Sequence, residues 1–202
     1  MEPFDTFILK RMLVQVGGVI AIAAILGGFV LAYNAAYNNI VYLDRVADGR
    51  WTTVTGDLVE RYGGISGLAR DIRPALGSDA PAMDAVTGKL SLWTSAVEGG
   101  DMARISSATT ALEDSIASFT LVLERHPDLE GSGEVGNFTE ILEATRARAS
   151  ADEADYDEAV REYNLAISTF PAGLWVENWG FTQRDYFTAR IGGREPPPIQ
   201  AD

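Results

Sequence analysis

The sequence predicts an all-α protein, with a single N-terminal transmembrane helix followed by an antiparallel four-helix bundle of long helices. The first observation behind this prediction is that no charged residue occurs between Arg11 and Asp44. The second is that apolar residues then recur at i, i+3 and i+4 in four long segments with short connections. Because strand-like alternation is nowhere sustained, these segments favour helix-on-helix packing.

The most apolar stretch, residues 12–32, has the length of a membrane span. At the helical rise it covers roughly 30 Å, whereas the apolar core of a secretory signal is about half as long. A cleaved signal is the alternative, because Lys10 and Arg11 precede the apolar run. However, Tyr33 and Asn34 occupy the −3 positions of the candidate cleavage points, where small residues are needed. We therefore expect the helix to be retained as an anchor.

The orientation of this anchor is predicted from the basic residues on its two flanks. Lys10 and Arg11 lie directly at the N-terminal edge, whereas Arg45 and Arg50 lie more than two helical turns beyond the other edge. Because basic residues favour the cytoplasmic side, we expect a cytoplasmic N-terminus in a bacterial inner membrane. The bulk of the chain is then periplasmic, and the alternative places it on the cytoplasmic side.

One face of the anchor carries only small side chains, at spacings of four, three and four residues. Such a face lets another helix backbone approach closely, which favours association in lipid. We predict membrane-helix packing there, with a lipid-facing surface as the alternative. At the exit from the membrane, Tyr33 and Tyr37 fit the interfacial belt of aromatic residues. The residues of the small face, hereafter the seam, are Gly17, Ala21, Ala24 and Gly28.

The first two helices after the anchor are delimited by proline and glycine. An apolar stripe from Tyr37 to Ile72 ends before Pro74. Because glycine weakens a helix, we expect a bend or close helix packing near Gly63–Gly67. The next helix is predicted to begin near Asp79–Pro81 and to end at Gly99–Gly100.

The last two helices are predicted from caps and breakers in the same way. Asp101 is expected to cap the third helix, which stops before Pro127. A loop follows from Gly131 to Gly136, and Asn137 is expected to cap a fourth helix that continues to Phe170.

The resulting organisation has one folded domain beyond the anchor. We divide the chain into a short N-terminal segment (1–11), the transmembrane helix (12–33), the helical bundle (34–171) and an aromatic C-terminal segment with a proline-rich tail (172–202). The tail, which contains Pro196–Pro198, is not expected to be helical.

Composition argues against several classes of function. The formal net charge is −13 with scattered basic residues, so nucleic acid and anionic lipid surfaces are poor partners for the soluble part. The chain has no cysteine and a single histidine, His126, which we expect to cap the last carbonyls of a helix. Because no pair of titratable groups resembles a catalytic or di-iron arrangement, we expect no enzymatic activity, no cofactor and no metal.

The fourth helix is the most acidic segment. We interpret it as a solvated helix face, with a docking surface for a basic partner or for divalent cations as the alternative. Three arginines (Arg146, Arg148 and Arg161) oppose nine acidic residues: Glu134, Glu140, Glu143, Asp152, Glu153, Asp155, Asp157, Glu158 and Glu162.

Aromatic residues are concentrated just after this helix. Trp175, Trp179, Phe181, Tyr186 and Phe187 fall within thirteen residues. Because tryptophan and tyrosine are enriched at binding hot spots and membrane interfaces, we predict that Trp175, Trp179 and Tyr186 contact a partner. For the two tryptophans, capping of the bundle core is the alternative. For Phe181 and Phe187 we favour folding back to cap the end of the bundle.

Four runs of residues then carry a resemblance to a known family. They are YNNIVYLDRVADGRW from Tyr37, HPDL from His126, GNFTEILEATRARA from Gly136 and YDEAVREYNLAISTFP from Tyr156. With the GF and DYF that follow, their order resembles the LemA family from about Tyr33 to Ala189. The resemblance implies an N-terminal membrane helix followed by a bundle of long helices, with no established enzymatic activity.

The chain departs from the family pattern at two places. RYGGISGL, from Arg61 to Leu68, stands where the family usually has Arg-x-x-Leu-Ile-Pro-Asn-Leu. Of two usual Tyr-Asn pairs in the last helix, the first is Tyr156–Asp157 here and the second, Tyr163–Asn164, is intact. We interpret the chain as a divergent member adapted to its own partner.

The leading hypothesis is a non-enzymatic scaffold or accessory subunit of a larger membrane complex, for which an energy-transducing complex is one candidate. Its expected partners are other membrane protein subunits and, through the anchor, the lipid bilayer. The alternative is an extracytoplasmic sensor or binding module that holds a small ligand between its helices. With only eleven residues before the anchor, we expect no output domain for a sensor on that side.

Overall fold

The computed structural model describes the backbone of residues 3–192 and the side chains of residues 10–129 and 131–192. The expectation for Pro196–Pro198 lies outside the described residues. Within them the chain forms helices and turns and no strand, which confirms the predicted all-α class. Contacts group the chain into two compact units. We call residues 1–43 with 164–183 the anchor unit, and residues 44–163 with 184–202 the bundle unit.

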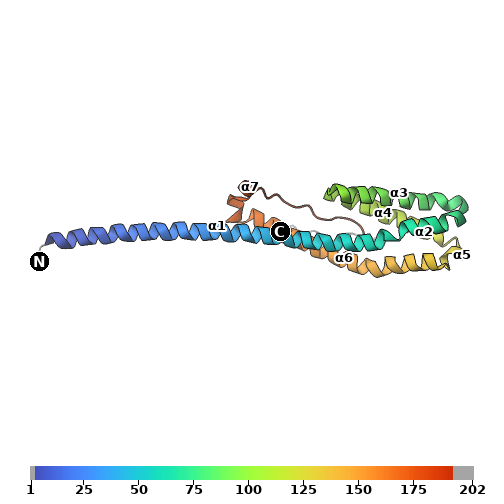
Figure 1. Cartoon of the computed structure of the whole chain (residues 1–202), viewed down its shortest axis with the longest axis horizontal. Helices are drawn as coiled ribbons and strands as arrows, with labels where there is room; N and C mark the ends of the chain where they lie inside the picture. Colours follow the sequence, from blue (N-terminus) through green and yellow to red (C-terminus); the bar gives the residue numbers. More distant parts are fainter. Residues whose placement is uncertain (1–2, 193–202) are drawn as a thin grey trace. The chain divides into compact units, whose positions relative to one another are not determined.

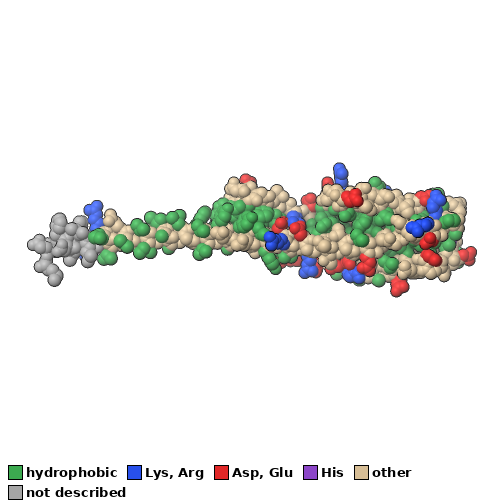
Figure 2. Space-filling model, viewed as in Figure 1, with side chains coloured by type: hydrophobic (Ala, Val, Ile, Leu, Met, Phe, Trp, Pro, Cys, Tyr) green, Lys and Arg blue, Asp and Glu red, His purple; other side chains and the backbone are tan. Residues whose placement is uncertain are grey.

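The longest element is α1 (Pro3–Gly63), whose first part belongs to the anchor unit. Among the described residues, one helix is long and apolar enough to span a membrane, and its apolar window is fully exposed. After the basic side chains near the start of α1, the surface of this helix is green and tan in Figure 2, without charge until Asp44. The anchor unit also contains the end of α6, the short turn η3 (Ala172–Leu174) and α7 (Val176–Trp179).

The break predicted at the glycines is found at Gly64, between the end of α1 and α2 (Ile65–Ile72). Two single turns, η1 (Arg73–Ala75) and η2 (Gly77–Asp79), then lead into α3 (Ala80–Gly99). Pro81 lies in the first turn of α3, and Gly100 ends that helix with a left-handed φ of 70°, a conformation that glycine adopts without strain. The predicted limits of this helix are confirmed.

The predicted start of the third helix of the bundle is confirmed, whereas the predicted start of the fourth is wrong. The side chain of Asp101 accepts a hydrogen bond from the Arg104 amide at 3.0 Å and so caps α4 (Met102–Leu123), as predicted. After α5 (Pro127–Glu130), however, α6 (Gly133–Ser168) begins before the predicted cap Asn137. The hydroxyl of Ser132 accepts from the Val135 amide at 3.3 Å, so a serine caps this helix more than a turn earlier.

The bundle unit is assembled from antiparallel helices. α3 and α4, which are joined by a tight turn, lie side by side (Figure 1). The remainder of α1 packs against α6 in the opposite direction, because the Arg50–Asp155 and Arg61–Thr145 contacts pair rising residue numbers on α1 with falling numbers on α6. The unit is therefore the predicted antiparallel bundle of long helices.

The core of the bundle unit is apolar and contains several aromatic rings. Its largest fully buried side chains include Leu58, Tyr62, Ile65, Met83, Leu112, Phe119, Tyr156 and Phe187. The last of these belongs to residues 184–192, a segment outside the helices that we call the strap. Phe187, Ala189 and Ile191 of the strap are buried in alternation, so a non-helical segment completes the core.

The single histidine does not cap the helix carbonyls as expected. The Nε2 atom of His126 lies 3.0 Å from Oδ2 of Asp79, and the Arg125 guanidinium lies 3.3 Å from the same oxygen. Both hydrogen bonds, that from His126 first, hold the pKa of the Asp79 carboxyl below its usual range. The imidazole therefore joins the start of α3 to the end of α4 through a side-chain contact.

Candidate functional site

The seam on α1 is an open surface. All four of its residues are exposed, and a methyl group at Gly17 or Gly28 would meet no described atom within 4 Å. The predicted packing therefore has no counterpart within the described part of the chain. Close approach by another helix is sterically free along this face, and packing against a partner stays a prediction.

The two predicted contact tryptophans, Trp175 and Trp179, lie together in the anchor unit, with ring centroids 5.8 Å apart. Trp175 directly precedes the single turn of α7 and Trp179 is its last residue, followed by Gly180 with a left-handed φ of 77°. Both rings pack against side chains of α1. We call the group the aromatic collar, and it consists of Phe29, Tyr33, Tyr37, Trp175, Trp179 and Phe181.

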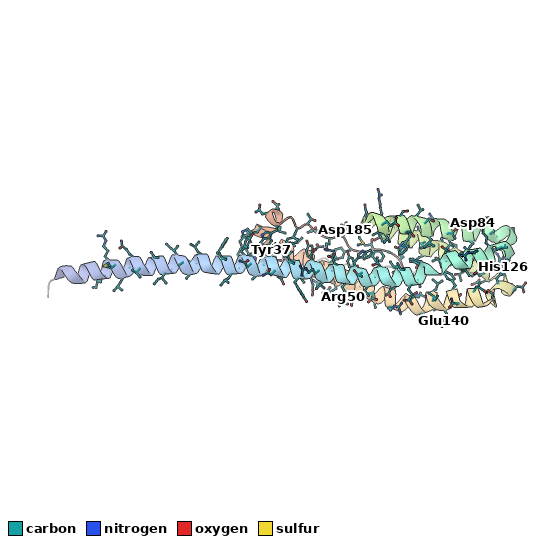
Figure 3. All side chains as sticks on the ribbon, viewed as in Figure 1. Tyr37, Arg50, Asp84, His126, Glu140 and Asp185 are labelled. Carbon is teal, nitrogen blue, oxygen red and sulfur yellow. The ribbon has the colours of Figure 1, made fainter. Side chains whose placement is uncertain are left out.

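Edge-to-face packing dominates the collar, as is usual for aromatic pairs. The Trp175 ring centroid lies 5.3 Å from that of Phe29 and 5.2 Å from that of Tyr33. Trp179 contacts Tyr33 and Tyr37 at 5.1 and 5.4 Å, and its indole N–H donates to the Tyr33 hydroxyl at 2.7 Å. Tyr37 marks the position of the collar in Figure 3.

The remaining aromatic residues of this region divide between the two units. Phe181 joins the collar, contacting Tyr37 at 5.9 Å, and does not cap the bundle as expected. Phe187 is fully buried in the bundle core beside Trp51, as expected. Tyr186 is half-buried against the same core, so the structure does not group it with the two tryptophans.

Apolar side chains are exposed beside the collar. Phe170 is 79% exposed and Leu174 is 63% exposed, within a turn where a Cβ at Gly173 would lie 3.1 Å from the Ser168 carbonyl oxygen. This close approach of the backbone favours glycine at position 173. Residues 164–183 contain one charged side chain, Glu177. Beyond Arg11, the anchor unit therefore combines exposed apolar surface with a single charged side chain.

The bundle unit instead contains a buried ion pair that sequence reasoning missed. The side chains of Arg61 and Glu113 are 3% and 4% exposed and form two parallel hydrogen bonds, at 2.6 and 3.0 Å. Arg61 also donates to the Leu142 carbonyl and the Thr145 hydroxyl, while the Tyr62 hydroxyl donates to Glu113 at 2.6 Å. Burial lowers the pKa of Arg61, but the hydrogen bonds and charge of Glu113 outweigh it and leave the pKa raised. The pair joins α1, α4 and α6.

The strap is held mainly by side chains that bind its backbone. The Phe187 amide donates to Asp157 at 3.0 Å, and the Tyr156 hydroxyl donates to the Asp185 carbonyl at 3.1 Å. The Tyr156–Asp157 departure from the family pattern therefore holds the strap, and an asparagine oxygen at position 157 would accept the same hydrogen bond. The amides of Thr188, Arg190 and Gly192 donate to Ser106, Thr110 and Glu113 of α4.

The acidic helix α6 is not uniformly solvated. Glu153 is 2% exposed, and its Oε1 atom has no hydrogen-bond partner within residues 3–192. Burial, together with the charge of Asp157, raises the pKa of Glu153 to about 8. Burial also raises the pKa of Asp157 to about 6, against the opposing hydrogen bond from Phe187.

Other acidic residues of α6 are paired. Asp155 binds Arg50 at 3.0 Å, and Glu158 binds Arg161 at 2.5 Å. A hydrogen bond with Asp57, followed by burial, raises the pKa of Asp152. Among the described residues, no group of three His, Cys, Asp or Glu side chains is arranged to hold a metal ion.

These features define a class of protein: an all-α bundle that is preceded by a long exposed apolar helix compatible with a membrane anchor. Within that class the chain belongs to the LemA family, whose model matches residues 50–200. The match starts later and ends later than the resemblance seen in the motifs. No curated protein and no solved structure matches the chain.

Proposed function

We propose that this protein is a non-enzymatic, membrane-anchored helical bundle that serves as a scaffold or accessory subunit of a larger membrane complex. The observation that carries the proposal is the charge-free apolar part of α1, exposed along its length and bearing the seam. An exposed surface of this kind is costly in water and favourable in lipid. The seam then gives a partner helix a place to pack.

Most of the polar side chains of the bundle unit that are described above are hydrogen-bonded to one another or to neighbouring elements, which supports a structural role. Arg61, Tyr62 and Glu113 bind one another, and their remaining hydrogen bonds go to α6 and the strap. His126 is paired with Asp79. Each of these groups has a structural partner, which favours a binding or scaffolding role over acid–base chemistry.

The proposed location is the bacterial inner membrane, with the bundle unit on the periplasmic side. The support for this orientation is the basic pair Lys10–Arg11 at the N-terminal edge of the span. A reporter that is active only in the periplasm, fused after Asp202, is expected to be active. Activity of a cytoplasm-specific reporter at the same position would reverse the orientation.

A small-ligand module is the alternative function. The feature that favours it is a hollow of about 630 Å³ on the α3–α4 face, lined mainly by small residues with Lys89, Asp101 and Arg104. Its volume suits a small molecule. The hollow is a surface depression, and the apolar anchor has no role in ligand binding there, so the scaffold role accounts for more of the molecule.

The scaffold proposal is tested at the seam by bulky substitutions. Gly17→Leu together with Gly28→Leu is expected to leave membrane insertion intact and to reduce co-purification of partner subunits in mild detergent, because leucine separates the packed helices. The matched control is Gly18→Leu with Gly27→Leu, which makes the same change at exposed glycines on other faces of the helix. Equal co-purification for both variants would show that the seam faces lipid, and recovery of a lone monomer from native membranes would contradict the scaffold role.

A further inference from the structure

We propose that the anchor unit contacts the bilayer a second time, through the exposed side chains of Phe170 and Leu174 beside the aromatic collar. In this arrangement the turn between α6 and α7 lies in the headgroup region of the leaflet from which α1 emerges. The inference rests on the proposed membrane anchoring. It adds a lipid surface as the partner of a region for which the sequence alone predicted protein contact.

The first argument is the distance along α1 between its basic end and the collar. From Arg11 to Phe29 the helix rises about 27 Å, and from Arg11 to Tyr33 about 33 Å. These values bracket the roughly 30 Å of a hydrocarbon core. With Arg11 at one interface, the opposite interface therefore falls between Phe29 and Tyr33. The Trp175 ring packs against both of these residues, at 5.3 and 5.2 Å.

The second argument is the chemical character of the collar. Tryptophan and tyrosine are enriched at membrane interfaces because their rings are apolar while their N–H and O–H groups remain polar. In the collar, the Trp179 N–H and the Tyr33 hydroxyl are hydrogen-bonded to each other at 2.7 Å. The indole N–H therefore has its hydrogen-bond partner without water. Such rings are suited to the boundary between lipid headgroups and acyl chains.

The third argument is the exposed surface next to the collar. Phe170 and Leu174 are 79% and 63% exposed and belong to the same unit as the anchor. Residues 12–43 carry no charge and residues 164–183 carry only Glu177, so few charged groups would have to leave water for this contact. A bilayer is the one occupant that the anchor itself would hold permanently next to this surface.

The absence of cysteine from the sequence allows a direct measurement of depth. Leu174→Cys is labelled with a nitroxide in the full chain, which is purified and reconstituted into vesicles of phosphatidylcholine and phosphatidylglycerol. Collision rates are then measured with oxygen, which concentrates in lipid, and with a water-soluble nickel chelate. Leu26→Cys, within the predicted span, calibrates the lipid environment, and Leu92→Cys, at a 60% exposed leucine of the bundle unit, calibrates water.

The expected result is that the label at position 174 collides with oxygen several-fold more, relative to nickel, than the label at position 92 does. Phe170→Cys is expected to give the same result. An aqueous value at position 174 with a lipid value at position 26 would overturn this inference and leave the anchor intact. An aqueous value at position 26 would refute the anchor itself.

A protein partner at the same surface gives a different outcome. The label at position 174 would then be aqueous in vesicles of the purified chain and would lose access to both reagents when partner subunits are added. That result would overturn the lipid contact and support the predicted role of Trp175 and Trp179 in partner binding.

Discussion

The anchor unit exposes apolar side chains, whereas the bundle unit buries charged ones. The anchor unit exposes Phe170 and Leu174 and carries almost no charge between residues 12–43 and 164–183. The bundle unit encloses a complete arginine–glutamate pair and an unpartnered carboxyl oxygen of Glu153. Exposed apolar surface and buried charge are both unfavourable in an ordinary soluble fold. Each unit therefore has its own explanation: the proposed membrane anchoring accounts for the exposed apolar surface of the anchor unit, and hydrogen bonds within the bundle unit account for its buried arginine–glutamate pair.

The largest expected effect comes from breaking the buried pair. Glu113→Gln leaves the Arg61 guanidinium buried without a counter-charge, so we expect the free energy of unfolding to fall by about 3–5 kcal/mol. The control is Asp84→Asn, which breaks a pair with Arg73 that is about half exposed and is expected to cost far less, because water screens the two charges. Denaturant unfolding of both variants measures the difference, and equal losses would refute the structural role of the buried pair.

The next effect is a dependence of stability on pH. The folded-state pKa of Glu153, about 8, lies above its usual value, so the folded chain binds more protons than the unfolded chain between about pH 4.5 and 8. Stability is therefore fully present below that window and is lost as the pH rises through it. From this group we expect unfolding to cost roughly 3–4 kcal/mol less at pH 8 than at pH 5, because each pH unit across the window is worth about 1.4 kcal/mol.

Two substitutions on α6 isolate this effect. Glu153→Gln removes the larger contribution and is expected to reduce the pH dependence to the smaller part that comes from Asp157, whose pKa burial raises to about 6. Glu140→Gln changes an exposed glutamate of the same helix, labelled in Figure 3, and should leave it unaltered. Denaturant unfolding at pH 5 and pH 8 measures the free energy of unfolding of both variants. If it changes with pH in the Glu153 variant as it does in the unaltered chain, other groups cause the pH dependence.

The smallest expected effect on the bundle comes from the collar. Changing both Trp175 and Trp179 to alanine should leave the melting of the bundle unit nearly unaltered, because these rings pack within the anchor unit. By contrast, Trp93→Ala removes a ring that is buried against Tyr62, and it should cost about 3 kcal/mol. A similar fall in the melting midpoint for the collar variant would show that the two tryptophans support the core.

The helices and their caps were largely predictable from the sequence, because their signals are local. The anchor, the break near Gly64 and the cap at Asp101 depend on residues within one or two turns. The prediction for the start of α6 was wrong because Ser132 and Asn137 are both good capping residues. Local preference does not distinguish between them. The predicted and observed starts therefore differ by a little more than one turn, because both positions offer an equivalent capping residue.

The contacts that define the candidate site were less predictable, because their partners lie far apart in the chain. Arg61 and Glu113 are 52 residues apart, and Tyr33 and Trp179 are 146 apart. The sequence signal was weak, since Glu113 directly follows Leu112 and lies on the flank of an uninterrupted apolar stripe. Only the fold shows that this charge is buried and which arginine is its partner.

The strap has a consequence for how the chain exchanges its amide hydrogens. Segments outside helices and strands ordinarily exchange quickly, because their amides are open to water. In the strap, the amides of Phe187, Thr188, Arg190 and Gly192 are all bound by side chains of the helices. These amides are released when the strap separates from the side chains of Asp157, Ser106, Thr110 and Glu113, which also exposes the buried Phe187, Ala189 and Ile191. An irregular segment should therefore show the slow exchange that is characteristic of a helix interior.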